Sequence, residues 1–469
     1  MNIRMFVEDE SVKDVGRLFT QYLLMAFIAL LLAGGFFRIF AQTITPVLAL
    51  QDPAIADQDD MCIWLHPDDP AKSVIITSDK KAVKLFVYDL NGNTLQTITP
   101  AGKPGNIDIR YNFPLNGQPI DIIAFNDRGN TKISIYKMNA ATRKLAFVSS
   151  FDAGSWPTEI YGFTLYHSRA SDRFFAIASG KSGQLRQWEL IDDNNGGING
   201  LEMRTWINGP GGITEGLVAD DETGLLFAAN ENNGIYAFNA DPTEPTPAGT
   251  LVAEIGKNGL TADVEGLTIY YAANGDGYLI ASSQGSDQYK VYERKPPHSF
   301  VKSFKVSGAT GTDGIDVINT NLGTALPKGI FLLHNNTNSK KEVLVCDYAD
   351  LGLAIDTDYW NPRGDVVSAI GDFDEAAQSF DLAQNFPNPF NPTTNIRYQL
   401  RRGSRVSLIV YDIVGRPVAT LVDQFQPQGS YTITWTAETI NGRNLPTGIY
   451  FAKLHAGDFI RTIKMNLMQ

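Results

Sequence analysis

The chain of 469 residues has only two cysteines, Cys62 and Cys346. So few cysteines exclude a fold held together by a framework of disulfides. A single bond between these two residues would be compatible with an exported protein. We favour two buried, reduced thiols instead, because free cysteine is among the most buried residue types.

Basic residues are outnumbered, since 39 Lys and Arg residues face 51 Asp and Glu residues and the net charge is −12. A protein that binds nucleic acid needs a basic face, so this balance argues against that class of partner. It does not exclude an anionic substrate, because a bound metal ion can reverse the local potential.

Long apolar runs are also rare. The run over residues 23–37 is shorter than the roughly 20 residues that span a bilayer. It predicts the core of a signal peptide within residues 1–41, with cleavage after Ala41; an uncleaved N-terminal anchor is the alternative. Long amphipathic helical patterns are scarce as well, whereas glycine and aromatic residues are frequent. This composition predicts an all-β fold.

Residues 52–365 carry an internal repeat. Short apolar segments between Gly, Asn and Asp turns look like equivalent third strands of a repeated unit: 83–88, 132–137, 184–190, 234–238 and 288–293. Glycines recur at positions 162, 216, 266 and 314, and similar spacing leads back to Asp108 and Asp60. Six units of about 50 residues, each readable as four strands, predict a six-bladed β-propeller.

The starts of the repeated units are rich in acidic residues. The first strand of each propeller blade lines the central channel, so these residues should meet at one end of it. They are Asp59, Asp60, Asp108, Tyr161, Glu215, Asp263, Glu265 and Asp313. Asp263 and Glu265 are two positions apart, which in extended chain places both side chains on one side. Such a ring needs cations, and many flexible oxygen ligands favour Ca²⁺ over Mg²⁺.

The character of the chain changes after residue 365. Residues 366–381 are acidic and irregular, which indicates a linker. Three prolines within 384–394, two of them in Asn-Pro pairs, exclude a helix there. Alternating strand patterns follow at 395–400, 406–412, 431–436 and 448–454. Residues 382–469 are therefore predicted to form a small Ig-like β-sandwich.

Seven motifs within residues 55–360 resemble the β-propeller phytases, the calcium-dependent phytate phosphatases of Bacillus type. Among them are Asp59-Asp60-x-x-Ile-Trp64, Tyr161-Gly-Phe-Thr-Leu-Tyr-His-Ser168 and Asp263-Val-Glu-Gly-Leu-Thr-Ile-Tyr-Tyr271. The resemblance implies a phosphoric monoester hydrolase of 3-phytase type that uses several calcium ions. Its substrate would be phytate or another inositol phosphate.

The resemblance also implies roles for individual residues. The calcium ligands would be Asp59, Asp60, Glu215, Asp263, Glu265 and Asp313. Lys80, Arg128 and Lys181 would bind the negatively charged phosphate group. Tyr161 would donate a hydrogen bond from its phenol to the phosphate, and Glu231 would lie at the phosphate and metal site. A water would attack phosphorus without a covalent nucleophile, and neither a Cys-x5-Arg loop nor an Arg-His-Gly pair is present.

The sequence departs from the usual pattern of this family at several positions. Met61 and Cys62 stand in place of Pro-Ala, and Ser182 stands where Glu is frequent. The loop 307–311 is short, and Asn335 and Asn336 replace an acidic pair. These differences bear on the number of calcium ions more than on the reaction.

Residues 380–469 resemble the C-terminal sorting domain of the type IX secretion system. The segments 384–394, 410–416 and 447–451 carry the likeness. It implies contact with outer-membrane secretion machinery and a protein secreted from, or held on the surface of, a Gram-negative-type bacterium. An adhesive sandwich that stays attached is the alternative. We expect a monomer.

Two other functions remain open at this stage. Calcium-bearing six-bladed propellers include lactonases, but a neutral lactone would not need the cations Lys80, Arg128 and Lys181. A non-catalytic propeller that binds a surface is the second alternative. Unchanged phosphatase activity after removal of Lys181 and Asp263 would favour that one.

Overall fold

The computed structural model describes residues 42–354 except 170, 273–274 and 338–339, then Arg363, and residues 381–468 except 383–384, 386–387, 401–403, 427–428, 438–444 and 457–458. The expected N-terminal segment 1–41 lies outside these residues, as does the expected linker apart from its last residue. No helix within the described residues is long and apolar enough to cross a membrane.

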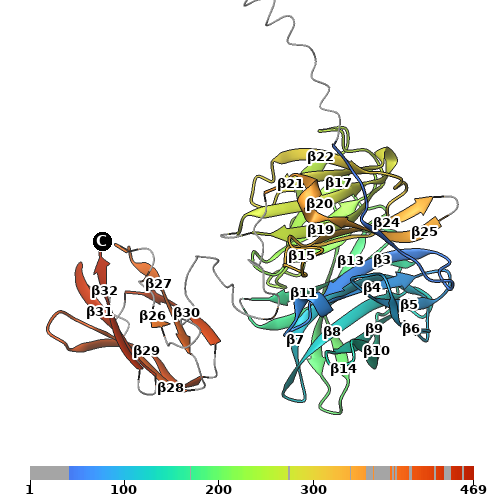
Figure 1. Ribbon diagram of the computed structural model, residues 1–469. Helices are drawn as coiled ribbons and strands as arrows, with labels where there is room; N and C mark the ends of the chain where they lie inside the picture. The colour runs from blue at the N-terminus through green and yellow to red at the C-terminus, as the bar shows by residue number, and fades with distance from the viewer. Residues whose placement is uncertain are drawn as a thin grey trace, which may run out of the picture.

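The first three blades are four-stranded antiparallel sheets (Figure 1). Blade 1 contains β3 (Gln58–Trp64), β4 (Val74–Asp79), β5 (Lys84–Asp89) and β6 (Thr94–Ile98). Blade 2 contains β7 (Pro104–Leu115), β8 (Gln118–Asp127), β9 (Lys132–Asn139) and β10 (Lys144–Asp152). Blade 3 contains β11 (Ile160–Ser168), β12 (Arg173–Gly180), β13 (Gln184–Asp192) and β14 (Ile198–Ile207).

The other three blades repeat this order. Blade 4 contains β15 (Leu217–Asp220), β16 (Leu225–Asn230), β17 (Gly234–Asn239) and β18 (Thr250–Glu254). Blade 5 contains β19 (Val264–Tyr271), β20 (Gly277–Ser283), β21 (Gln288–Glu293) and β22 (Phe300–Val306). Blade 6 contains β23 (Ile315–Ile318), β24 (Ile330–Thr337) and β25 (Lys340–Asp347). Short 3-10 helices include η1 (Pro70–Lys72), η3 (Gln284–Ser286) and η4 (Tyr348–Leu351).

The blades form a closed ring, which confirms the six-bladed propeller. Each innermost strand contacts the next, in the order β3, β7, β11, β15, β19, β23 and back to β3. The five segments expected as third strands are β5, β9, β13, β17 and β21, each third in its sheet. Phe86 of β5, Ile109 of β7 and Leu332 of β24 share one buried apolar cluster, so blade 1 packs on both its neighbours.

The N-terminal segment fastens the last two blades. β1 (Gln42–Ile44) pairs in parallel with β22, and β2 (Leu48–Leu50) is the outer strand of blade 6, antiparallel to β25. Both strands precede residue 52, the predicted start of the propeller.

Cys62 and Cys346 are buried and remain free thiols among the described residues, which confirms the prediction of two buried, reduced thiols. Strand pairing, and not a disulfide, therefore joins the first described strands to the last two blades of the propeller.

Leu50→Ala is expected to lower the free energy of unfolding by about 2–5 kcal/mol, because Leu50 is fully buried where β2 completes blade 6. Val47→Ala is the matched control, since Val47 lies between the same two strands but is 55% exposed. Its expected effect is below about 0.5 kcal/mol. Denaturant unfolding measures both variants, and equal stabilities would contradict the closure by β2.

The recurring glycines mark close approaches between blades. A Cβ atom on Gly216 would lie 1.8 Å from the carbonyl oxygen of Glu265, and one on Gly162 would lie 2.0 Å from that of Glu215. Any side chain would push the neighbouring inner strands apart. The glycine repeat and the acidic repeat therefore have one structural origin, since each glycine packs against the acidic residue of the next blade.

The channel is crossed by an arginine. Arg110 of β7 pairs with Asp108 at 3.0 Å and with Asp221, which follows β15, at 2.8 Å. Because β7 and β15 belong to blades 2 and 4, the guanidinium bridges non-adjacent blades. Asp108 also accepts a hydrogen bond from Thr164 Oγ1 at 2.7 Å. Our placement of Asp108 at the channel mouth is corrected, because its side chain is committed to this interior network.

The C-terminal part consists of two sheets. One contains β26 (Asp381–Leu382), β27 (Thr393–Leu400) and β30 (Gly429–Thr436). The other contains β28 (Ser404–Tyr411), β29 (Pro417–Gln426), β31 (Gly448–Ala456) and β32 (Phe459–Leu467). Ile396, Trp435, Leu408 and Leu454, two from each sheet, share one buried core, as the predicted sandwich requires. β29 and β32 were not expected from the sequence.

Candidate active site

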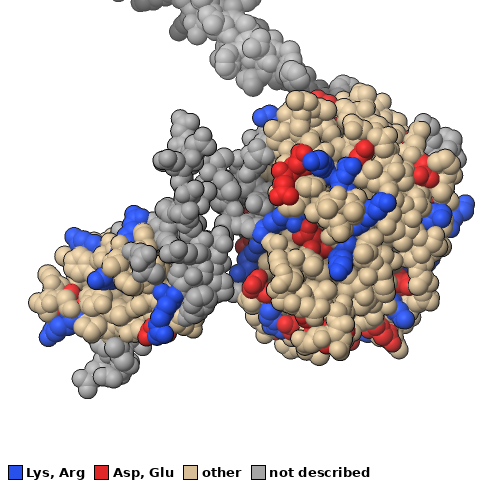
Figure 2. Space-filling model, turned by 60° about the horizontal axis from the view of Figure 1, so that its bottom comes forward, with Lys and Arg blue, Asp and Glu red and all other residues tan. Residues whose placement is uncertain are grey.

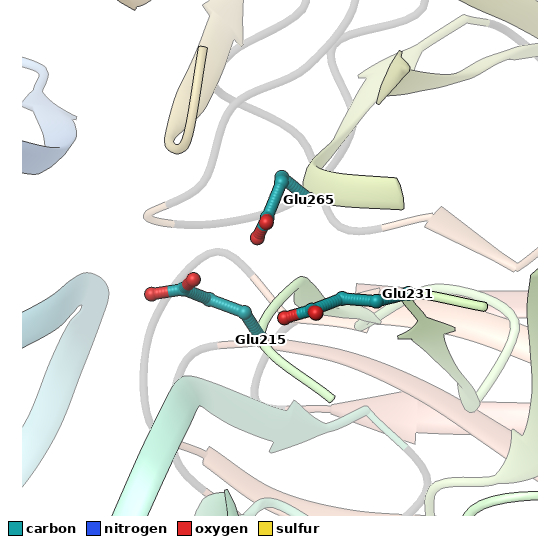
Figure 3. A group of neighbouring side chains, drawn as sticks. All are labelled: Glu215, Glu231 and Glu265. Carbon is teal, nitrogen blue, oxygen red and sulfur yellow. The ribbon is translucent and has the colours of Figure 1, made fainter. Parts of the chain in front are cut away.

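Three glutamates converge at one end of the channel. Glu215 lies two positions before the start of β15, Glu231 lies in the turn between β16 and β17, and Glu265 lies in β19. One carboxylate oxygen from each residue lies within 4.8 Å of the others, and all three residues are buried. Figure 3 shows the three side chains gathered at one place in the fold.

Burial and mutual repulsion raise the pKa values of this cluster. Desolvation is the largest cause in each case, and it raises the pKa of Glu231 to about 7. The pKa of Glu215 is raised although Arg128 opposes the shift, and that of Glu265 is raised well above its ordinary value. Oε2 of Glu265 is buried without a hydrogen-bond partner among the described residues. Converging buried carboxylate oxygens of this kind fit a hard cation.

Two of the predicted cations lie against these acids. Lys80 Nζ is 2.6 Å from Asp59 Oδ1 and 3.1 Å from Asp313 Oδ2. Arg128 Nη2 is 2.6 Å from Glu215 Oε1 and 3.4 Å from Asp59 Oδ2. On the propeller face seen in Figure 2, basic and acidic side chains are likewise interspersed. Lys80 and Arg128 thus bring positive charge to the channel mouth, but both form ion pairs with carboxylates there.

Tyr161 brings the third cation into the same site. The guanidinium carbon of Arg128 lies 4.4 Å from the centre of the Tyr161 ring, and Lys181 Nζ lies 4.5 Å from it. Both distances allow cation–π attraction. Burial is the largest cause that raises the pKa of the Tyr161 hydroxyl, and Glu215 raises it further. The phenol therefore keeps its proton and can donate a hydrogen bond.

Nine of the eleven predicted site residues form one continuous network: Asp59, Lys80, Arg128, Tyr161, Lys181, Glu215, Glu231, Glu265 and Asp313. Asp60 lies deeper, where it accepts a hydrogen bond from the backbone of Ile107 at 3.0 Å and lines the channel cavity. Asp263 is exposed at the outer side of the cluster, close enough to contribute to the raised pKa of Glu231.

The regular strand expected across Asp263 and Glu265 is absent. Asp263 has a φ of 56°, and the register of β19 against β20 shifts between Val264 and Leu267. The two carboxylates therefore do not lie side by side on one strand face. The left-handed residue turns Asp263 toward solvent, while Glu265 remains buried.

Sequence reasoning missed two residues of this site. His334 of β24 is fully buried, and its Nδ1 lies 3.4 Å from Asp313 Oδ2. Glu159 forms an ion pair with Lys181 at 2.9 Å. Glu159 stands two positions before Tyr161, so its place next to a strand start was an available signal. His334 offered none, because it is an isolated histidine in an apolar strand.

The short loop 307–311 is fastened by neutral groups. Asn335 Oδ1 accepts a hydrogen bond from the backbone N–H of Thr310 at 3.2 Å, and the N–H of Asn336 donates to the Thr310 carbonyl at 2.9 Å. The asparagines that replace an acidic pair thus hold the loop directly to β24.

Comparisons with known proteins show which families the two parts of this chain resemble. Residues 29–349 match the family described as phytase, and residues 384–466 match the secretion system C-terminal sorting domain. A 3-phytase of Bacillus subtilis (strain 168) is 42% identical over 313 residues, which cover 64% of this chain and 80% of the relative. A solved structure of a calcium-binding protein, regucalcin from Agrobacterium tumefaciens strain C58, overlays with a TM-score of 0.43 and 10% identity, covering 66% of this chain and 95% of that one.

Proposed function

Because this chain belongs to the phytase family, we propose that it is a phosphoric monoester hydrolase that releases phosphate from phytate, myo-inositol hexakisphosphate. The observation that carries the proposal is the channel mouth, where Lys80, Arg128 and Lys181 surround buried carboxylates. A polyanionic substrate requires such cations. A neutral lactone does not, so the geometry favours the phosphatase over the lactonase.

We propose that several calcium ions bind at this mouth. The ligands would come from Asp59, Glu215, Glu231, Glu265 and Asp313, with Asp263 on the outer side and Asp60 in the channel. All are oxygen donors, as Ca²⁺ prefers, and the unpartnered oxygen of Glu265 fits a cation. Calcium would supply positive charge to the acidic mouth and make water there more acidic.

The cations of the chain would hold the phosphoryl group. Carboxylates that bind a divalent ion no longer need Lys80 and Arg128 as counter-ions, so both become available to phosphate oxygens. Arg128 can hold two oxygens with its planar fork, while Lys80 and Lys181 act as point charges. Tyr161 would donate a hydrogen bond, and Glu231 can hold or release a proton near neutral pH. An in-line attack by water then needs no covalent nucleophile.

The assay that tests this function compares phosphate release from phytate with ring opening of a neutral lactone. We expect phosphate release only, and a loss of it in Lys181→Ala and Asp263→Ala. Lactone opening without phosphate release would identify the lactonase. Phosphate release that is unchanged in both variants would contradict the assignment of these residues to the active site. It would favour a propeller that only binds a surface.

Calcium affinity is expected to depend on pH because Glu231, whose pKa is raised to about 7, must lose its proton to bind the ion. Between pH 8 and pH 6 the apparent affinity should fall by up to about tenfold for this one group. Titration calorimetry at the two pH values measures the difference. The variant Glu231→Gln should bind more weakly but with a flatter pH dependence. Equal wild-type affinity at both pH values would contradict the assignment.

The C-terminal sandwich indicates export, since its residues match a secretion sorting domain. We propose that it engages outer-membrane secretion machinery of type IX and delivers the propeller to the medium or the cell surface of a Gram-negative-type bacterium. We further propose that the propeller, over residues up to about 365, acts as a monomer, and that residues 366–381 link it to the sandwich over 382–469.

A further inference from the structure

Glu159 lies at the rim of the site and faces two lysines. Its Oε2 is 2.9 Å from Lys181 Nζ, and its Oε1 is 4.0 Å from Lys103 Nζ. Glu159 precedes β11 of blade 3, Lys181 follows β12 of the same blade, and Lys103 precedes β7 of blade 2. One carboxylate is thus placed between lysines from two blades.

Backbone hydrogen bonds hold this arrangement in place. The N–H of Lys181 donates to the carbonyl of Glu159 at 3.2 Å, and the N–H of Arg128 donates to the carbonyl of Lys103 at 2.9 Å. The Lys181 ammonium also lies over the Tyr161 ring. Glu159 stays ionised at neutral pH, because Lys181 lowers its pKa although partial burial opposes this. The backbone therefore holds Glu159 and Lys181 next to each other, within reach of an ion pair.

The pairing of Lys181 differs from that of the other two cations. Lys80 and Arg128 are paired with carboxylates that we assign to calcium, so metal binding can release them. Glu159 is not among the assigned ligands, so calcium at those ligands would not take Glu159 away from Lys181. A phosphate group that approaches Lys181 must then compete with a carboxylate already bound there.

We propose that Glu159 competes with phosphate oxygens for Lys181 and so weakens the binding of inorganic phosphate at the site. This inference rests on the proposed function. Its consequence for turnover is faster release of the product, because the carboxylate returns to Lys181 as the phosphate leaves. Lys103 would keep Glu159 near the site while Lys181 is occupied.

Titration of the calcium-loaded full chain with inorganic phosphate tests this directly. Glu159→Gln keeps the shape of the side chain and removes its charge. Because the pair is partly exposed, with 38% and 34% of the two side chains accessible, we expect phosphate to bind about 2- to 5-fold more tightly. In a Lys181→Met background the same substitution should have no effect, which isolates the coupling of the two residues.

Glu254→Gln is the matched control, since Glu254 pairs with Lys257 on the outer strand of blade 4 and the change in net charge is the same. It should leave phosphate binding unchanged. Equal or weaker phosphate binding by Glu159→Gln would overturn the proposal, as would a gain that persists without Lys181 or appears in the control. Calorimetry reads binding and not catalysis, so failure of this inference is distinguishable from a wild type that releases no phosphate from phytate.

Discussion

Glu265→Gln is expected to lower kcat/KM for phytate about 100- to 1,000-fold at saturating calcium, the usual effect of removing one preorganised charge from an active site. Glu265 is buried at the centre of the glutamate cluster, and one of its oxygens has no hydrogen-bond partner among the described residues. An amide of the same shape offers a metal ion one weaker oxygen and no charge. Phosphate release over a range of calcium concentrations measures the loss, together with a shift of half-activation to higher calcium.

The same substitution should stabilise the calcium-free protein. Burial, and then repulsion from Glu215, raise the pKa of Glu265 well above its ordinary value. The folded protein therefore binds more protons at this position than the unfolded chain, so this group lowers stability as the pH rises. We expect Glu265→Gln to increase the free energy of unfolding by about 1–3 kcal/mol at pH 8, with a smaller gain toward pH 5.

This opposite effect on activity and stability separates a functional role from misfolding. Glu293→Gln, an exposed residue at the end of β21 in the same blade, is the control and should change neither quantity. Loss of stability in Glu265→Gln, or kcat/KM within about twofold of the wild type, would contradict the role that we give to Glu265.

Arg128→Lys is the second substitution with a large expected effect. Arg128 is almost fully buried, contacts Glu215 and Asp59, and donates to the Asn106 side chain and the Tyr161 carbonyl. Lysine keeps the charge but cannot reproduce the planar fork. We expect kcat/KM to fall about 100-fold. The free energy of unfolding should fall by about 1–3 kcal/mol, because a single ammonium cannot serve all the buried acceptors that the guanidinium contacts.

Arg173→Lys provides the comparison for this variant. Arg173 also pairs with a glutamate, Glu189, but its side chain is 40% exposed and lies away from the channel mouth. A charge-preserving change there should leave phosphate release nearly intact. If Arg128→Lys proved as active as Arg173→Lys, the guanidinium fork would have no part in holding the phosphate.

The propeller could be predicted because its pattern is local and repeated. The third strands are short apolar segments bounded by turn residues. The glycines recur because each lies against a carbonyl of the next blade, as Gly216 does against Glu265. The closing strands β1 and β2 could not be predicted. They have three residues each and pair with β22 and β25, some 260 to 300 residues away. Segments this short show no periodic pattern that would predict a strand.

The site was predicted as a set of residues but not as an arrangement. Acids at strand starts indicate convergence, yet only the structure shows that Asp108 binds Arg110 inside the channel and that Asp263 adopts a left-handed backbone. These outcomes depend on bulges and on contacts across the channel. Glu159 was missed although it stands next to a strand start, because only the fold shows its ion pair with Lys181.

The measurement that tests the central claim most directly is phosphate release from phytate by chelator-treated protein as calcium is added back. In the calcium-free mouth, Lys80 and Arg128 are paired with Asp59 and Glu215, so neither cation is free to hold a polyanion. We predict no release after chelation, full recovery with calcium, and little recovery with an equal concentration of magnesium. Undiminished release in the chelated protein would contradict the account.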